Sequence, residues 1–219
     1  RIKMSNYSFG VRTKRWIRFS INYIKERMRG LDFSMVYVGD IQKNVAEFHG
    51  YSMTDEKDMK RMLKAIPVNP SECSFLDVGC GSGILSVVAL KYRANHALGT
   101  DLDPNAIIAS EENAQQNDIA PEKLEVIEGN IIDDKAVQDR CGYECYDVVC
   151  ANILADVLEP LSAEITQHMK PGAYFITSGI IDTKEQEVAE CFKKNPELEI
   201  VEINHDGEWV NITARKRGI

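Results

Sequence analysis

Long apolar runs are missing from this chain of 219 residues. None approaches the roughly 18 consecutive apolar residues that a membrane-spanning helix requires. The chain also lacks a charged start followed by an apolar block, which is the pattern of a secretory signal. These absences predict a cytoplasmic protein with no membrane span. No repeat or low-complexity tract is present, and the length predicts one domain with a small appendage.

Cysteine and histidine patterns typical of metal or hydrolytic sites are lacking too. The six cysteines contain no C-x-x-C pair, and several lie in or beside apolar strands, so we predict buried free thiols. A zinc site made by Cys141, Cys145 and a distant histidine is the alternative, but the spacing is unfavourable and no metal is predicted. The four histidines are scattered, and none forms a nucleophile motif with serine or cysteine. Hydrolytic chemistry therefore has no support.

A glycine-rich turn is the most informative feature that the sequence does contain. An apolar strand ending at Val78 runs into Gly79, Gly81 and Gly83, and an apolar helix-forming segment follows. Glycines let the chain turn sharply and bring backbone amides against a ligand at a helix N-terminus. The dinucleotide fingerprint G-x-G-x-x-G would need glycine at Ile84. The G-x-G-x-G spacing therefore indicates a nucleotide cofactor other than NAD.

An acid at the end of the next strand strengthens this interpretation. Asp101 closes the apolar stretch 97–101, about twenty residues after the glycines, where a carboxylate can accept hydrogen bonds from both ribose hydroxyls. We therefore predict Asp101 to be the ribose ligand.

Short apolar runs alternate with helical stretches, as in a doubly wound α/β fold with a parallel sheet. Strands are expected at Ser74 to Val78, His96 to Asp101, Leu124 to Glu128, Asp147 to Ala151, Tyr174 to Ser178, Leu198 to Ile203 and Trp209 to Ala214. Helices are expected from Gly83 to about Tyr92, Pro104 to Gln116, Ala155 to Met169 and Thr183 to Lys194. We predict a turn at Gly172 after Pro171, and a hairpin through residues 205–207 between the last two strands.

The chain resembles the class I S-adenosylmethionine-dependent methyltransferases, whose motif I reads (D/E)-x-G-x-G-x-G and whose second strand ends in an acid. Residues 77–83 and Asp101 match that pattern. Within this superfamily it is most similar to the PrmA-type enzymes, which methylate protein eleven of the large ribosomal subunit. The likeness covers roughly residues 75–216 and is carried, in order, by LDVGCGSGILS, GTDLDPNAI, ANILADVLEPL, GAYFITSGI and DGEWVNITARK.

The resemblance implies S-adenosylmethionine as the cofactor and a Rossmann-like, mostly parallel seven-stranded sheet with an antiparallel last strand and helices on both faces. The cofactor contacts that it implies are Asp77, Gly79, Cys80, Gly81, Gly83, Asp101, Leu102, Asn130 and Ile131. Two alternatives stay open. Ile131 is suited to packing on the adenine face, although an isoleucine after a strand is more often a core residue. Asp103 is a further candidate contact, but ahead of Pro104 it is also suited to capping a helix.

Asn152 is the predicted catalytic residue. It follows the fourth strand in Ala-Asn-Ile-Leu, where an amide oxygen can accept a hydrogen bond from a substrate nitrogen and orient its lone pair. The segment resembles the Asn/Asp-Pro-Pro-aromatic motif of nitrogen methyltransferases. The alternative is that Asn152 caps the following helix.

The chain departs from the PrmA-type pattern upstream of Phe75. Residues 48–54 stand where the family has a glycine- and threonine-rich lid, but do not match it, and the space is too short for the family's recognition domain. We therefore predict that this domain is absent. Residues 1–54 are predicted to form a basic helical arm and a lid-like connection, and residues 55–219 the cofactor-binding domain.

The first thirty residues carry nine Lys/Arg and one acid, a net charge of +8, which leaves −16 for the other 189 residues. A helix over residues 12–29 has an apolar stripe, which predicts either packing on the domain or contact with RNA, an acidic protein or a membrane surface.

From these features we predict an S-adenosylmethionine-dependent methyltransferase that acts on a nitrogen, with a protein amine as acceptor, and the resemblance implies a ribosomal protein. The alternatives are a small-molecule or RNA methyltransferase, whose RNA binding would be sensitive to salt, and a cofactor-binding subunit without catalysis.

Overall fold

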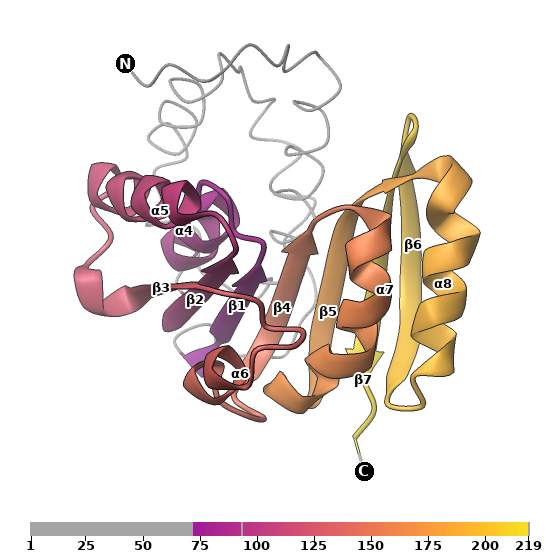
Figure 1. Ribbon diagram of the computed structural model, residues 1–219. Helices are drawn as coiled ribbons and strands as arrows, with labels where there is room; N and C mark the ends of the chain where they lie inside the picture. Colours follow the sequence, from indigo (N-terminus) through magenta and orange to yellow (C-terminus); the bar gives the residue numbers. More distant parts are fainter. Residues whose placement is uncertain (1–71, 93, 219) are drawn as a thin grey trace.

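A single twisted sheet of seven strands organises residues 72–92 and 94–218, which are the residues that the computed structural model describes (Figure 1). The strand order is β3-β2-β1-β4-β5-β7-β6, with β7 antiparallel to both of its neighbours and the other six strands parallel. The strands are β1 (Ser74–Val78), β2 (His96–Asp101), β3 (Leu124–Glu128), β4 (Tyr146–Asn152), β5 (Met169–Ile181), β6 (Leu198–Asp206) and β7 (Trp209–Lys216). The predicted fold class and the antiparallel last strand are confirmed.

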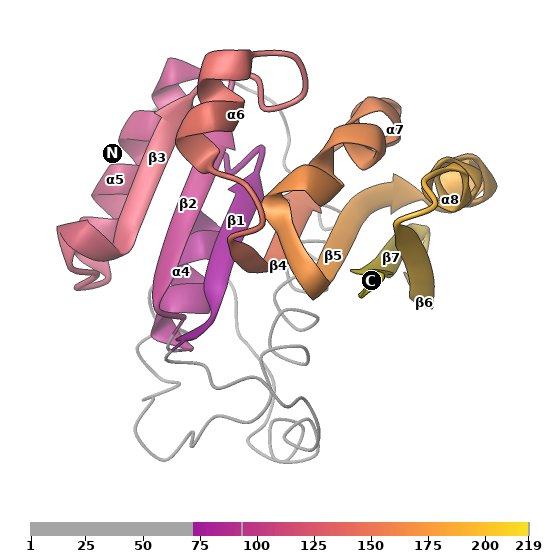
Figure 2. The same cartoon turned by 90° about the horizontal axis from the view of Figure 1, so that it is seen from below.

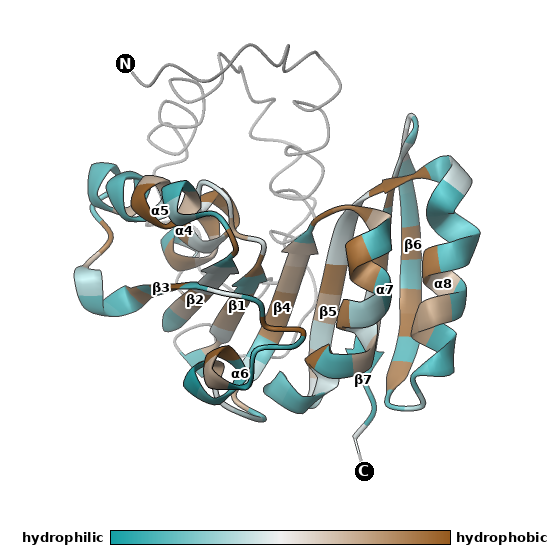
Figure 3. Ribbon diagram, in the orientation of Figure 1, coloured by the Kyte–Doolittle hydropathy of each residue, from teal (hydrophilic) through white to brown (hydrophobic). Residues whose placement is uncertain are grey.

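Helices cover both faces of this sheet (Figure 2). On one face, apolar residues of α6, α7 and α8 share a core cluster with side chains of β1, β4, β5 and β7. On the other face, α4 packs against β1, β2 and β4, with α5 beside it. The helices are α4 (Ile84–Lys91), α5 (Pro104–Gln116), α6 (Lys135–Cys141), α7 (Ala155–Glu164) and α8 (Glu185–Lys194). Figure 3 shows the result, with apolar strands in the centre and helices whose solvent-facing sides are polar.

Local sequence explains where these helices begin. Asp103 accepts a hydrogen bond from the backbone N–H of Asn105 at 2.9 Å, and Pro104 occupies the first turn of α5. The capping interpretation of Asp103 is therefore confirmed. Asp134 caps α6 in the same way, through the N–H of Ala136 at 2.9 Å.

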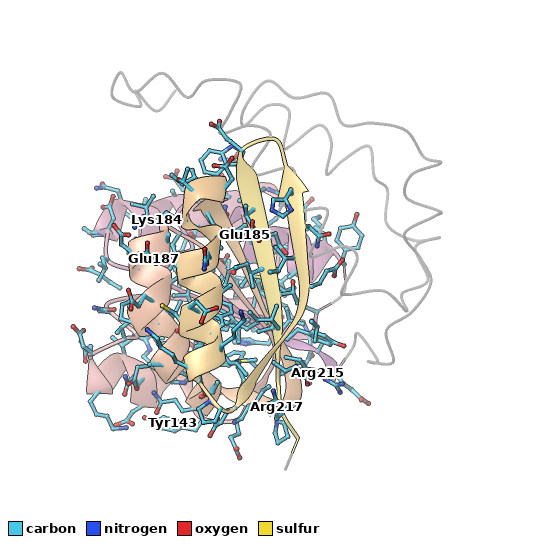
Figure 4. The ribbon with its side chains drawn as sticks, turned by 90° about the vertical axis from the view of Figure 1, so that its right-hand side faces the viewer. Tyr143, Lys184, Glu185, Glu187, Arg215 and Arg217 are labelled. Atoms are coloured by element: carbon cyan, nitrogen blue, oxygen red, sulfur yellow. The ribbon has the colours of Figure 1, made fainter. Side chains whose placement is uncertain are left out.

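Polar side chains cluster at the start of α8, where Figure 4 shows Lys184, Glu185 and Glu187, while Arg215 and Arg217 lie toward the opposite end of the sheet.

The first three strands and α5 have the predicted bounds. The helix predicted from Ala155 to Met169 is shorter: α7 ends at Glu164, residues 165–168 form a 3₁₀ turn, and Met169 already pairs with Tyr146 in the sheet. The predicted start of α8 is likewise a 3₁₀ turn, over residues 182–184. Helix α6 was not predicted, because seven residues carry too short an apolar pattern to be recognised.

The predicted turn at Gly172 is wrong, whereas the predicted hairpin between the last two strands is confirmed, with its turn displaced along the chain. Pro171 and Gly172 lie inside β5, where Gly172 has φ +80° and allows an irregularity in the strand instead of a turn. The hairpin between β6 and β7 turns at Gly207 and Glu208, so His205 belongs to the strand. Its Nε2 lies 2.6 Å from the Glu185 carboxylate, a contact that ties the end of β6 to α8.

The predicted basic arm and lid-like connection fall outside the described residues, so the domain boundary at residue 55 stays a prediction. None of the helices within the described ranges is long and apolar enough to cross a membrane.

Candidate active site

The glycine-rich turn lies at the carboxyl edge of the sheet, between β1 and α4 (Figure 1). Here β1 has β2 on one side and β4 on the other, so the connections that follow β1 and β4 leave the sheet in opposite directions. Ligands of open α/β sheets bind in the crevice at such a point. The fold therefore brings the ends of β1, β2, β3 and β4, with their predicted site residues, to one place.

Each glycine of the turn has a positive φ, between +54° and +70°, which side-chain-bearing residues rarely adopt. Gly79 donates its N–H to the Thr100 carbonyl at 2.8 Å, and a Cβ on it would lie 2.5 Å from Ile153. A Cβ on Gly83 would meet Ser110 at 2.8 Å. Around Gly81, by contrast, no atom lies within 4 Å of the Cβ position. Two glycines are thus required by packing, and the third leaves open space beside the backbone.

Asp101 joins β2 to this turn. One carboxylate oxygen accepts a hydrogen bond from the Gly81 N–H at 2.8 Å, and the other accepts one from the Asp103 N–H at 3.0 Å. Two backbone amides therefore hold the carboxylate in place at the end of the strand. Each carboxylate oxygen has a second lone pair, so ligand hydroxyls can still be accepted.

A cavity of about 330 Å³ opens beside Asp101. Of the predicted cofactor residues, Gly79, Asp101, Leu102, Asn130 and Ile131 line it. Sequence reasoning missed the other lining residues, which are Val78, Thr100, Gly129, Ile132, Ile153, Leu154 and Val157. Leu102 and Leu154 are 69 % and 72 % exposed. These exposed leucines, close to the ends of β2 and β4, give the cavity apolar walls that suit a flat aromatic ring. Leu154 could have been recognised from its place two residues after β4.

Asn130 and Ile131 contribute in different ways. The Asn130 side-chain oxygen accepts a hydrogen bond from the Ile132 N–H at 3.1 Å, which fixes the turn after β3. Ile131 is buried and belongs to the main core cluster, so its core interpretation holds although it also touches the cavity.

The remaining members of the glycine segment do not line the cavity. Cys80 is buried, with its Sγ 3.7 Å from the Ser110 hydroxyl, and burial raises the pKa of its thiol to about 12. All six cysteines lie in the described ranges and are free, and all but Cys145 are buried, so the prediction of buried free thiols is largely confirmed.

Asp77 lies in β1, two residues before Gly79, and is only 1 % exposed. One of its oxygens accepts hydrogen bonds from the Ser86 N–H at 3.1 Å and hydroxyl at 2.8 Å, while the other, Oδ1, is buried without a hydrogen-bond partner. Burial raises the pKa of this carboxyl to about 6 from its ordinary 3.8. A buried, half-satisfied carboxylate destabilises the fold and is typical of a site that receives a ligand.

This raised pKa predicts how Asp77 affects stability. Between about pH 4 and pH 6 the Asp77 carboxyl of the folded protein keeps a proton that the unfolded chain has lost, so the contribution of this group to stability falls as the pH rises through this window and does not change above it. Asp77→Asn removes the ionisation and should raise the unfolding free energy at pH 7.5 by roughly 1–3 kcal/mol. Denaturant titration at pH 7.5 and pH 4 measures the gain, which should nearly vanish at pH 4. An equal gain at both pH values would contradict the assignment.

Asn152 is the last residue of β4 and is half-buried. Its side-chain oxygen accepts a hydrogen bond of 2.5 Å from the hydroxyl of Ser178, which lies opposite it on β5. The N-cap of α7 is Leu154, with no side-chain cap, so Asn152 does not cap that helix. The structure thus leaves the amide oriented at the carboxyl edge, next to Ile153 of the cavity wall.

Within the described residues, no group of histidine, cysteine, aspartate and glutamate could hold a metal ion.

Comparison with known proteins shows which family has a sequence like that of this chain. The family model for ribosomal protein L11 methyltransferase (PrmA) matches residues 61–217. A ribosomal protein L11 methyltransferase of Lachnospira eligens is 85 % identical over 142 residues, which are 65 % of this chain and 45 % of that protein. One from Agathobacter rectalis is 46 % identical over 177 residues, 81 % of this chain and 54 % of that protein. The chain thus spans about half the length of these relatives.

Solved structures of methyltransferases have a fold similar to that of this chain. The crystal structure of a ribosomal protein L11 methylase from Lactobacillus delbrueckii subsp. bulgaricus superimposes with a TM-score of 0.60 at 28 % identity, covering 69 % of this chain and 72 % of that chain. An RNA methyltransferase from Salinibacter ruber, solved with S-adenosyl-L-homocysteine, shares the fold with a TM-score of 0.53 at 16 % identity, over 76 % of this chain and 94 % of that chain. The predicted family, read first from the glycine segment and Asp101, is confirmed: the chain belongs to the ribosomal protein L11 methyltransferase (PrmA) family.

Proposed function

We propose that this chain binds S-adenosylmethionine in the cavity beside Asp101 and transfers its methyl group to an amine of a protein of the large ribosomal subunit. The observation that carries the proposal is the meeting of the glycine turn, the Asp101 carboxylate and the Asn152 amide at one edge of the sheet. The names of the relatives supply the acceptor, protein L11.

The residues present fit this cofactor. The open space beside Gly81 admits a ligand close to the backbone, the Asp101 carboxylate suits a ribose, and the apolar walls at Leu102 and Leu154 suit an adenine ring. The unpartnered Asp77 oxygen is suited to a cationic group. When bound, the cofactor supplies an already activated methyl group, so the protein has to position and desolvate the acceptor and needs no acid or base of its own.

Asn152 and Ser178 would carry out this positioning. An acceptor amine must be neutral to have a free lone pair, although the pKa of a free lysine is near 10.4. Both side chains are uncharged, so a hydrogen bond to the Asn152 oxygen can orient the amine without a negative charge that would favour the ammonium form. Desolvation at the half-buried amide favours the neutral amine further.

A cytoplasmic location is also part of the proposal. Free thiols persist where disulfides are kept reduced, and all six cysteines of the chain are free.

The function is tested by incubating the full chain with methyl-labelled S-adenosylmethionine and purified L11. We expect label in the protein, and peptide mapping should find it on lysine side chains or the N-terminal amine. Label in RNA or in small metabolites would favour the alternative methyltransferases instead. Cofactor binding in calorimetry without transfer to any acceptor would favour a non-catalytic subunit.

A further inference from the structure

Helix α5 buries polar side chains on the face that it turns toward the glycine-rich turn. Ser110 is fully buried and Asn113 is 6 % exposed. Residues three apart lie on one face of a helix, and a buried polar group there destabilises the fold unless it is hydrogen-bonded. The Ser110 hydroxyl donates to the Gly81 carbonyl at 3.0 Å. The Asn113 amide donates to the Ser82 carbonyl at 2.7 Å, so α5 holds two successive carbonyls of the turn.

Gly81 depends on hydrogen bonds more than the other two glycines of the turn do. A Cβ would collide with a neighbouring side chain at Gly79 and Gly83, whereas no atom lies within 4 Å of the Cβ position at Gly81. A glycine without such contacts has the widest choice of φ and ψ. The Gly81 N–H is bonded to the Asp101 carboxylate at 2.8 Å, and its carbonyl is bonded to Ser110. These two bonds fix the peptide planes on both sides of Gly81, and therefore its φ and ψ.

The Ser110 hydroxyl has one proton to give, and Cys80 leaves it free for Gly81. The Cys80 Sγ lies 3.7 Å from the Ser110 oxygen. Burial raises the pKa of this thiol to about 12, so the thiol keeps its proton at neutral pH and can donate it to the serine oxygen. The buried thiol, the hydroxyl and the Gly81 carbonyl thus form a chain in which each group has a partner.

We propose that Ser110 and Asn113 are positioning residues for the cofactor, and that Ser110 acts through Gly81 on the Asp101 carboxylate. This inference rests on the proposed binding of S-adenosylmethionine beside Asp101. The carboxylate oxygen that accepts from Gly81 keeps its direction only while Gly81 keeps its φ and ψ. Without the serine hydroxyl, the Gly81 carbonyl loses a buried donor and the turn relaxes to find another. The carboxylate then loses the orientation that two ribose hydroxyls require.

The test measures the affinity of the full chain for S-adenosylhomocysteine by calorimetry, in Ser110→Ala, Asp101→Ala and the double variant. This ligand has the adenine and ribose of the cofactor but no methyl group to transfer. We expect Ser110→Ala alone to weaken binding about tenfold. In the Asp101→Ala background the same substitution should change the affinity by about twofold or less, because the carboxylate through which Ser110 acts is already gone.

Asn113→Leu provides a second variant, with Asn117→Leu as its matched control. Asn113→Leu removes the bond to the Ser82 carbonyl and should weaken binding about fivefold. Asn117 stands one turn beyond Asn113 at the end of α5, is 7 % exposed, and donates its amide to the Asn113 carbonyl at 2.8 Å. Its substitution should lower the melting temperature and leave the affinity unchanged.

Three results would overturn the inference. They are an unchanged affinity in Ser110→Ala, an equal loss from this substitution with and without the Asp101 carboxylate, and an equal loss in Asn113→Leu and Asn117→Leu. The last two would mean that α5 acts on binding only through the stability of the fold. A wild-type chain that binds no S-adenosylhomocysteine would instead contradict the proposed function.

Discussion

Asp101→Ala should weaken S-adenosylmethionine binding by roughly 100-fold or more. Hydrogen bonds to a charged group are worth about 1.5–3 kcal/mol each, and the carboxylate is proposed to accept two from the ribose hydroxyls. The substitution also removes the hydrogen bond of 2.8 Å that the Gly81 N–H donates to the carboxylate, so the glycine turn loses a restraint. Calorimetric titration with S-adenosylmethionine and S-adenosylhomocysteine, with NAD as a negative control ligand, measures the effect.

Asp103→Ala is the matched control for this prediction. Asp103 stands two residues away, is exposed, and its carboxylate caps α5 through the Asn105 N–H. Its loss should cost about 1 kcal/mol of stability and change cofactor affinity little. If the two variants weakened binding equally, Asp101 would act through the fold of the loop and not as a ligand.

Asn152→Ala should lower kcat for L11 methylation about 100-fold while cofactor affinity stays within a few-fold of the wild type. The reason is that methyl transfer depends on the alignment of the attacking nitrogen, and a misplacement of about 1 Å can cost on the order of 100-fold. Steady-state kinetics at saturating acceptor, together with calorimetry for the cofactor, separates the two quantities.

Ser178→Ala tests the same arrangement from the other side of the hydrogen bond. The serine hydroxyl donates to the Asn152 oxygen at 2.5 Å, so its loss should release the amide and lower kcat by a smaller factor, without removing the contact to the acceptor. A Ser178→Ala variant as inactive as Asn152→Ala would show that the serine itself takes part. Full activity of Asn152→Ala would exclude the asparagine as the residue that orients the acceptor.

The glycine turn, the acid after β2 and the start of α5 could be predicted because their causes are local. A positive φ favours glycine, a helix that starts with a proline is favoured by a capping side chain just before it, and short apolar runs between turns form strands. For the same reason the first three strands were predicted with their exact bounds. Helix α6 was missed because seven residues cannot form a stable helix alone, so its stability comes from tertiary packing of Val137 and Cys141.

The candidate site was predictable only in part, since strand ends are visible in the sequence but their neighbours are not. Asn152 and Asp101 were found from their places after strands. The burial of Asp77, the Ser178 hydroxyl that holds Asn152, and the leucine walls of the cavity depend on residues far apart in the chain. The pKa of Asp77 is raised by desolvation, which no sequence pattern records.

The sequence by itself determined the class of fold, the cofactor turn and the family, because backbone sterics and strand-to-helix alternation act over a few residues. Tertiary structure alone decided which polar groups meet and which remain unpaired. Ser178 donates its hydroxyl to Asn152, from which it is 26 positions distant in the sequence. Asn204 and Asn211, whose amide nitrogens are buried without a hydrogen-bond partner, lie opposite each other only because β6 and β7 pair in that register. Hydrogen bonding depends on the distance between atoms, and that distance is set by how the sheet assembles.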